Sequence, residues 1–245
     1  MIHMENNELN DLFDYGYKIF QNPNYFKFSV DSVLLGEFVN LRANDKKVLD
    51  LCSGNGSIPM ILSSKYGSKI EITGVELQKT IYDMAIESIK YNNITNINML
   101  NKDVNELCSV LPLHSFDVVT VNPPYFKVYD NSFKNKDDIK SIARHEIKTN
   151  LENIISISSN MLKNGGYLYM VHRPERLRDI IIELENNKFG LKRLVPIYND
   201  DESKCVFILI EAIYNGKSYV NIDKPVVLNH NLKTYKNIFG GNLWN

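Results

Sequence analysis

Lys47–Ser57 reads KVLDLCSGNGS, in which a short apolar run leads into a loop that contains Gly54 and Gly56. The apolar run predicts a buried strand over Lys47–Leu51, and the residues that follow predict a helix over Ser57–Tyr66. Glycine permits a tight turn and lets the backbone approach a ligand closely. The stretch therefore predicts a strand, a ligand-binding turn and a helix, the repeating unit of an α/β fold.

Short apolar runs alternate with helical patterns along the rest of the chain. The alternation predicts a doubly wound, mostly parallel α/β sheet, Rossmann-like, with helices on both faces. No helical pattern separates the last two strands, so we expect them to form an antiparallel, hairpin-like pair. The further strands expected are Ile70–Val75, Ile97–Leu100, Phe116–Val121, Gly165–Val171, Leu191–Ile197 and Cys205–Ile213, and the further helices are Asp31–Asn40, Gln78–Tyr91, Asp103–Val110, Leu151–Leu162 and Pro174–Asn187.

The composition is that of an ordinary globular protein. Of 245 residues, 44% are hydrophobic and 23% are charged, which suffices for a core without disulfides or metals. The 28 basic residues nearly balance the 29 acidic ones, which excludes indiscriminate nucleic-acid binding but not a local basic patch. Scattered cysteines and the absence of a signal-peptide or membrane-spanning pattern lead us to expect a cytoplasmic protein without a membrane segment.

We expect one domain over residues 1–245. Residues 1–45 are interpreted as an N-terminal extension that covers a bound cofactor, residues 122–150 as a substrate loop, and residues 215–245 as a C-terminal tail whose role the sequence does not decide. Loops as long as 122–150 are usually functional or disordered. We expect a monomer, although no sequence feature determines the oligomeric state.

Acidic residues follow three successive strands. Asp50, Glu76 and Asp103 lie where ligands bind in doubly wound folds, at the carboxyl ends of the strands. Pro59 stands where a dinucleotide fingerprint needs its third glycine, which disfavours NAD. Glu76 suits ribose hydroxyls, Asp103 an adenine amine and Asp50 an ammonium group, so the pattern favours S-adenosylmethionine. The competing interpretation is an ordinary glycine turn with solvent-facing acids.

The motif Asn122-Pro123-Pro124-Tyr125 follows the fourth strand directly. Two prolines restrict the backbone and remove two donors, which leaves the Asn122 side-chain oxygen and the Pro123 carbonyl as a rigid pair of acceptors. Such a pair can hold both hydrogens of a planar NH2 group and orient its nitrogen for attack, while Tyr125 offers a face on which the amine-bearing ring stacks. We therefore expect all four residues to be catalytic; the competing interpretation is a turn after a buried strand.

These motifs together resemble the class I amino-methyltransferases that use S-adenosylmethionine. The segments KIFQNPNYFKFSVDSVLLGEFV, ARHE and HRPERLRDII narrow the resemblance to the bacterial tRNA(Val) adenine-37 N6-methyltransferase group. The resemblance implies a seven-stranded sheet with an antiparallel last strand, methyl transfer to adenine N6 in a tRNA anticodon loop, and S-adenosylhomocysteine as product. The cofactor-binding residues that it implies are Phe28, Asp31, Asp50, Cys52, Gly54, Asn55, Gly56, Glu76, Leu77, Asp103, Val104 and Asn122.

Basic residues gather after the NPPY motif and again after the fifth strand. We expect them to neutralise tRNA phosphates beside the target-base site; the competing interpretations are a solvated mobile loop and ordinary surface charge paired with acids. No cluster of metal-ligating residues is evident, so no metal is expected. The candidate RNA-contacting residues are Lys127, Lys134, Lys136, Arg144, His145, Arg173 and Arg176.

Other functions remain open from the sequence. A protein glutamine methyltransferase also uses NPPY, but that family carries a helical domain before the glycine loop, where only about 45 residues stand here. DNA adenine methyltransferases commonly use DPPY with a separate recognition domain, and rRNA enzymes also share NPPY. The alternative without catalysis is a silent RNA-binding protein, against which the intact motif argues.

Overall fold

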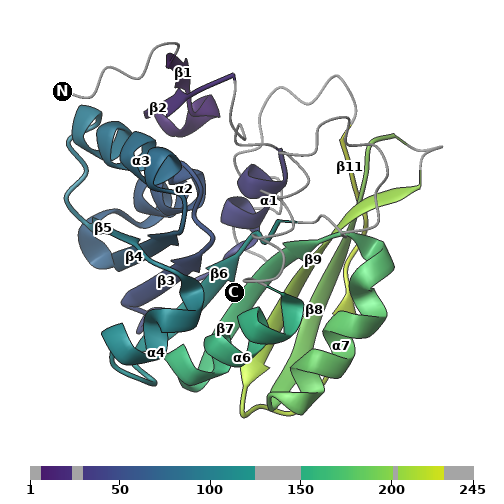
Figure 1. Ribbon diagram of the computed structural model, residues 1–245. Helices are drawn as coiled ribbons and strands as arrows, with labels where there is room; N and C mark the ends of the chain where they lie inside the picture. The colour runs from purple at the N-terminus through teal and green to yellow at the C-terminus, as the bar shows by residue number, and fades with distance from the viewer. Residues whose placement is uncertain (1–6, 24–29, 125–149, 201–203, 229–245) are drawn as a thin grey trace, which may run out of the picture.

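The computed structural model describes residues 7–23, 30–124, 150–200 and 204–228 (Figure 1). Seven long strands form the main sheet in the order β8-β9-β7-β6-β3-β4-β5. The five strands from β7 to β5 are parallel, whereas β9 runs antiparallel to both β7 and β8. The strands are β3 (Lys47–Leu51), β4 (Glu71–Glu76), β5 (Ile97–Asn101), β6 (Phe116–Val121), β7 (Leu162–His172), β8 (Phe189–Tyr198) and β9 (Cys205–Tyr214).

The prediction of a doubly wound, mostly parallel sheet with an antiparallel terminal pair is confirmed. The structure adds two short strands that the sequence did not indicate. β10 (Asn221–Ile222) and β11 (Val226–Val227) pair in parallel with the outer edge of β8. The described part of the C-terminal tail therefore extends the sheet, while residues 229–245 lie outside the described part of the chain.

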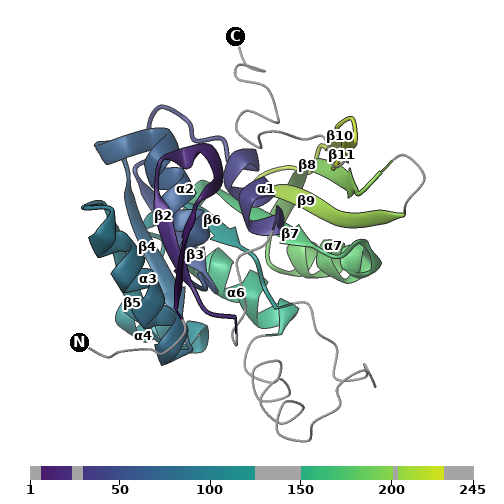
Figure 2. The same ribbon diagram turned by 90° about the horizontal axis from the view of Figure 1, so that it is seen from above.

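Helices cover both faces of the sheet (Figure 2). On one face α1 and α2 contribute Leu34, Phe38 and Leu62 to a core with strand residues such as Val48 and Val118. The helices are α1 (Val30–Phe38), α2 (Ser57–Tyr66), α3 (Lys79–Tyr91), α4 (Leu107–Val110), α6 (Leu151–Met161) and α7 (Leu177–Asn186), with 3-10 turns η1 (Phe13–Tyr15), η2 (Gly67–Lys69), η3 (Val104–Glu106) and η4 (Pro174–Arg176).

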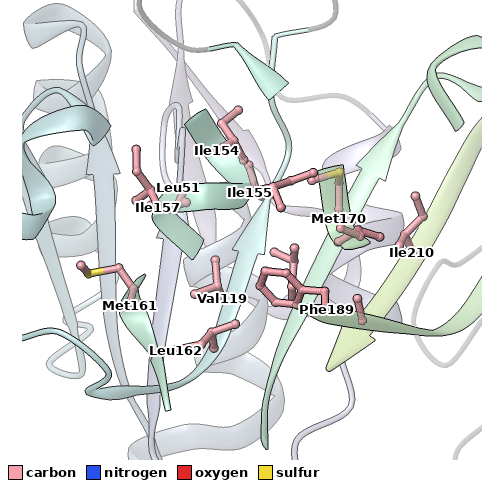
Figure 3. Packing of buried hydrophobic residues seen from close by; sticks show 14 of the residues in the cluster. Leu51, Val119, Ile154, Ile155, Ile157, Met161, Leu162, Met170, Phe189 and Ile210 are labelled. Carbon is pink, nitrogen blue, oxygen red and sulfur yellow. The ribbon is translucent and has the colours of Figure 1, made fainter. Parts of the chain in front are cut away.

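On the opposite face α6 and α7 pack on the alternate residues of the same strands. Figure 3 shows Ile154 and Ile155 of α6 against Leu51, Val119 and Met170 of β3, β6 and β7, and all five are fully buried. Successive residues of a strand point to opposite faces. Because both faces are covered, the middle strands are mostly apolar, as β6 illustrates: its run FDVVTV is buried throughout and has Asp117 and Thr120 as its polar residues.

The expected elements agree with the structure apart from their ends. The helix expected over Asp103–Val110 is divided into η3 and α4, and that expected over Pro174–Asn187 into η4 and α7. In both places a 3-10 turn forms the first turn, which is common at helix starts. The helix expected over Asp31–Asn40 is α1, which begins one residue earlier and ends at Phe38.

A β-hairpin near the N-terminus was not expected. β1 (Glu8–Asp11) and β2 (Lys18–Gln21) pair antiparallel, and β2 lies along α3. The Phe20 amide donates to Ser88 Oγ at 2.9 Å, the Lys18 amide donates to Asn92 Oδ1 at 2.8 Å, and Asn92 Nδ2 donates back to the Lys18 carbonyl at 2.6 Å. Side chains of α3 and of Asn92, the residue that caps its C-terminus, thus pair with the open edge of β2 and fix the hairpin beside the glycine loop.

Candidate active site

The carboxyl ends of β3, β4, β5 and β6 meet at one edge of the sheet, and the loops that follow them form the candidate site. The loop after β3 passes through the left-handed backbone region at Cys52, Gly54 and Gly56, with φ of +58°, +58° and +84°. Glycine adopts this region without strain. A Cβ on Gly56 would lie 3.3 Å from Ala85 Cβ of α3, so this position also needs a small residue.

Ser53 fastens the glycine loop to β4. Its amide donates to the Val75 carbonyl at 2.9 Å, its Oγ accepts from the Val75 amide at 3.0 Å, and the same hydroxyl donates to the Asp50 carbonyl at 2.9 Å. Ser53 is buried. These bonds give the loop a fixed shape, and sequence reasoning did not single out Ser53.

Glu76 at the end of β4 lies directly against the glycine loop. Its Oε2 accepts from the Gly54 amide at 2.9 Å and its Oε1 from the Gln78 amide at 2.7 Å. Burial raises the pKa of Glu76, and these backbone donors partly counteract the rise. Asn101 Nδ2 of β5 donates to the carbonyls of Glu76 and Leu77 at 2.8 and 3.0 Å, so it fixes the turn that carries both predicted residues.

Asp50 at the end of β3 is fully buried. Its Oδ1 accepts from Thr120 Oγ1 of β6 at 2.6 Å, and Asp50 and Thr120 are register partners in adjacent strands. Oδ2 has no hydrogen-bond partner among the described residues. Burial raises the pKa of Asp50 to about 7, although the Thr120 and Ser53 hydroxyls act in the opposite direction. A buried carboxylate oxygen without a partner fits a cationic ligand.

Three predicted cofactor residues have structural contacts of their own. The Asp103 carboxylate caps η3 by accepting from the Asn105 amide at 3.0 Å, while Val104 beside it is buried. Asn55 is buried and donates from Nδ2 to the Phe20 carbonyl at 3.2 Å, so it joins the glycine loop to the hairpin. Burial, reinforced by Glu76 and Asp50, raises the pKa of the Cys52 thiol, which keeps this thiol protonated.

Asn122 follows β6 and reaches the N-terminal helix. Its Nδ2 donates to Ser32 Oγ of α1 at 2.9 Å. Asp31 is buried and accepts at Oδ1 from the Ser32 amide at 2.9 Å. Pro123 is buried and Pro124 is exposed, while Tyr125 and Phe28 lie outside the described residues. The structure therefore brings together the predicted Asn122 and Asp31 and adds Ser32, which no sequence pattern marked beyond its position after Asp31.

The predicted RNA-contacting residues that are described already have protein contacts. Arg173 donates from Nη1 to the Val206 carbonyl at 3.1 Å and stacks its guanidinium over the Phe207 ring at 4.8 Å. Arg176 donates from Nε to Asp179 Oδ2 at 2.8 Å. The interpretation of Arg173 and Arg176 as tRNA ligands stays a prediction. Lys127, Lys134, Lys136, Arg144 and His145 lie outside the described residues.

His172, the last residue of β7, is buried next to these arginines. Its Nδ1 accepts from the Arg173 amide at 2.8 Å. Burial, and then the charge of Arg176, lower the pKa of His172 to about 4, so the ring is neutral at physiological pH. Within the described ranges no three His, Cys, Asp or Glu side chains gather in a way that could hold a metal ion, and no helix is long and apolar enough to span a bilayer.

Residues 42–223 match a family model described as a methyltransferase domain. The tRNA1(Val) (adenine(37)-N6)-methyltransferase of Pseudoalteromonas translucida is 29% identical to this chain over 168 residues, which span 69% of this chain and 68% of the relative. Other relatives with the same name, from Mannheimia succiniciproducens and Flavobacterium johnsoniae, are matched over 58% and 88% of their own length at 26% and 22% identity.

Solved structures share the fold. A predicted O-methyltransferase from Agrobacterium tumefaciens superposes with a TM-score of 0.66 at 21% identity, covering 88% of this chain and 99% of that one. The TYW2 protein of M. jannaschii, solved in complex with AdoMet, superposes with a TM-score of 0.55 at 15% identity, covering 87% of each chain. At such identities the likeness establishes the architecture alone.

Proposed function

The chain belongs to the methyltransferase domain family, and from this premise we propose that it transfers a methyl group from S-adenosylmethionine to the N6 amine of an adenine in tRNA. The proposed target is adenine 37 of tRNA1(Val), because relatives of this chain are named as methyltransferases of that adenine. The observation that carries the proposal is the contact of Asn122 with the helix at Ser32, at the same sheet edge as the acids Asp50 and Glu76.

The acids at the strand ends suit S-adenosylmethionine. This group supplies, when bound, a methyl carried by a sulfonium, and it also presents an ammonium and ribose hydroxyls. Asp50 has a buried oxygen in need of a donor, and Glu76 lies against the glycine loop. We assign Asp50 to the ammonium, directly or through a water, and Glu76 to the ribose. Gly54 and Gly56 let the backbone approach closely.

Asn122 and Pro123 are the proposed acceptors for the target amine. The lone pair of an aryl amine is delocalised into the ring, which makes the nitrogen a poor nucleophile. Hydrogen bonds from both N–H groups to Asn122 Oδ1 and the Pro123 carbonyl hold the nitrogen in line for attack and stabilise the positive charge that develops on it. Transfer would form the nitrogen–carbon bond and break the sulfur–methyl bond of the sulfonium, which leaves as a neutral thioether, and the extra proton then leaves to solvent. No strong general base is needed beforehand.

A polyanionic substrate is compatible with a net charge of -1. Asp50, Glu76 and Asp103 are used for the cofactor in this assignment, which leaves basic residues elsewhere to neutralise phosphates. Arg173 is exposed and follows β7, the strand next to β6, so it lies at the sheet edge where Asn122 lies. A target base must be flipped out or already unstacked in a loop to enter such a site. We accordingly propose that the protein acts where tRNA is found, in the cytoplasm.

A transfer assay tests the proposal. Total tRNA from a strain without the gene is incubated with the protein and with S-adenosylmethionine labelled in its methyl group, and nucleosides are separated after digestion. Label in N6-methyladenosine is expected. A parallel reaction contains a purified protein release factor in place of tRNA. Label in the release factor and none in tRNA would replace the proposed substrate by a glutamine amide.

The variant Asn122→Ala tests the assigned chemistry. Turnover should fall at least a hundredfold, because a preorganised group that stabilises transition-state charge typically contributes about 10²–10³ in rate. Cofactor affinity, measured by calorimetry, should stay within about twofold. A large loss of cofactor affinity would show that Asn122 belongs to the cofactor site instead.

A further inference from the structure

We propose that Ser32 is a positioning residue that anchors the Asn122 side-chain amide beside the substrate; this inference rests on the proposed function. An asparagine amide has a donating nitrogen and an accepting oxygen that are nearly equal in shape. Only the oxygen can accept a hydrogen bond from a target amine. The site therefore needs a contact that holds the amide group in place, with its oxygen within reach of the target amine.

The Ser32 hydroxyl accepts from Asn122 Nδ2 at 2.9 Å across a separation of 90 residues. This bond uses the nitrogen and so leaves the carbonyl oxygen on the other side of the amide group. In the flipped orientation the oxygen would lie against Ser32 and the NH2 group would meet the NH2 group of the substrate. Two donors cannot form a hydrogen bond, so only the orientation in the structure is productive. Because a hydroxyl can donate as well as accept, Ser32 holds the plane of the amide, and the target amine selects between the two orientations.

Helix α1 holds Ser32 firmly. Ser32 is 7% exposed, and its amide donates to Asp31 Oδ1 at the start of the helix. Leu34, Leu35 and Phe38 of the same helix are at most 1% exposed. A buried, well-packed helix limits how far the serine hydroxyl can move.

The far end of α1 is fixed as well. Lys65 Nζ of α2 donates to the carbonyls of Gly36, Glu37 and Val39 at 2.9, 2.9 and 3.2 Å. The first two belong to the last turn of α1, and Val39 directly follows the helix. Glu37 Oε1 accepts from Tyr15 Oη at 2.6 Å. A Cβ on Gly36 would lie 2.7 Å from Ile61 Cγ2, so α1 and α2 approach closely there. These contacts make α1 a rigid base for the hydroxyl.

The test compares Ser32→Ala with Ser158→Ala. Ser158 is a fully buried serine of α6 whose hydroxyl donates to the Ile154 carbonyl, on the opposite face of the sheet. Loss of one net hydrogen bond of about 1 kcal/mol should lower kcat of Ser32→Ala about fivefold, with cofactor affinity within twofold. Ser158→Ala should keep the wild-type kcat. Ser32→Thr, which retains the hydroxyl, should recover most of the loss.

A second readout does not depend on the substrate. In the cofactor-free protein, hydrogen exchange of the Asn122 side-chain amide is followed by NMR. We expect at least fivefold faster exchange in Ser32→Ala than in the wild type and no change in Ser158→Ala.

The outcomes separate the two proposals. Equal exchange rates in wild type and Ser32→Ala, or an unchanged kcat, would overturn the positioning role. Equal losses of kcat and cofactor affinity would also overturn it and would make Ser32 a residue of the cofactor site. Accelerated exchange together with no wild-type transfer to tRNA would support the positioning role while refuting the proposed substrate.

Discussion

Replacing Asp50 by asparagine should stabilise the cofactor-free protein at high pH and weaken cofactor binding. Folding raises the pKa of Asp50 from 3.8 to about 7 because the carboxyl group is buried. An acid with a raised pKa in the folded state lowers stability as pH rises from about 4 to about 7, and the full cost remains above that range. Asparagine does not titrate, so its contribution is independent of pH.

The magnitude follows from the shift. One unit of pKa corresponds to about 1.4 kcal/mol, so the ionised carboxylate costs the fold roughly 4 kcal/mol at pH 8 and roughly 1.5 kcal/mol at pH 5. The asparagine NH2 placed at the Oδ2 position lacks a partner and costs about 1–3 kcal/mol at every pH. The stability of Asp50→Asn relative to wild type should therefore rise by about 2–3 kcal/mol between pH 5 and pH 8.

Urea unfolding at pH 5, 6.5 and 8 measures this difference, with slopes compared to confirm two-state behaviour. Asp117→Asn is the matched control. Burial acts against the ionised form of Asp117, but hydrogen bonds from Lys163 and from the Lys46 and Lys47 amides lower its pKa overall. Stability from a lowered pKa is lost only as pH falls below about 4, so the Asp117→Asn difference should be flat from pH 5 to pH 8.

Calorimetry measures the second expected effect, the loss of cofactor affinity. An ionised Asp50 that faces an ammonium is worth about 1.5–3 kcal/mol, so Asp50→Asn should weaken S-adenosylmethionine binding roughly 10- to 100-fold at pH 7.5. Methylthioadenosine has no ammonium group, and its affinity should change far less. A stability difference that does not vary with pH would refute the reasoning about burial. Equal weakening of both ligands would refute the assignment of the ammonium.

Three further changes test other parts of the molecule. Glu76→Ala should weaken cofactor binding at least tenfold by calorimetry, and unchanged affinity would remove the ribose role. Lys134→Glu together with Lys136→Glu should weaken tRNA binding and reduce the slope of log K against log salt by about two, whereas an unchanged slope would favour a solvated loop. Ser88→Ala removes the acceptor for the Phe20 amide, so hydrogen exchange should quicken in the hairpin but not in the main sheet; equally fast exchange in both would indicate global destabilisation instead.

The sequence by itself determined the order of strands and helices, the place of the glycine loop and the position of the NPPY motif. These features are local. A short, mostly apolar stretch such as Lys47–Leu51 is a local strand signal, and Gly56 suits the positive φ that the backbone adopts in the loop that follows. The helix ends were less certain, because a first turn in the 3-10 form, as at Val104–Glu106, leaves no distinct pattern.

Only the tertiary structure decided which polar groups meet. Thr120 reaches Asp50 because β3 and β6 are neighbours in a particular register, and Ser32 reaches Asn122 because α1 packs over the same sheet edge. The hairpin and the strands β10 and β11 likewise depend on partners far along the chain. Hydrogen bonds need matched geometry within a few tenths of an ångström, and one sequence does not encode the distance between residues 32 and 122 in any local pattern.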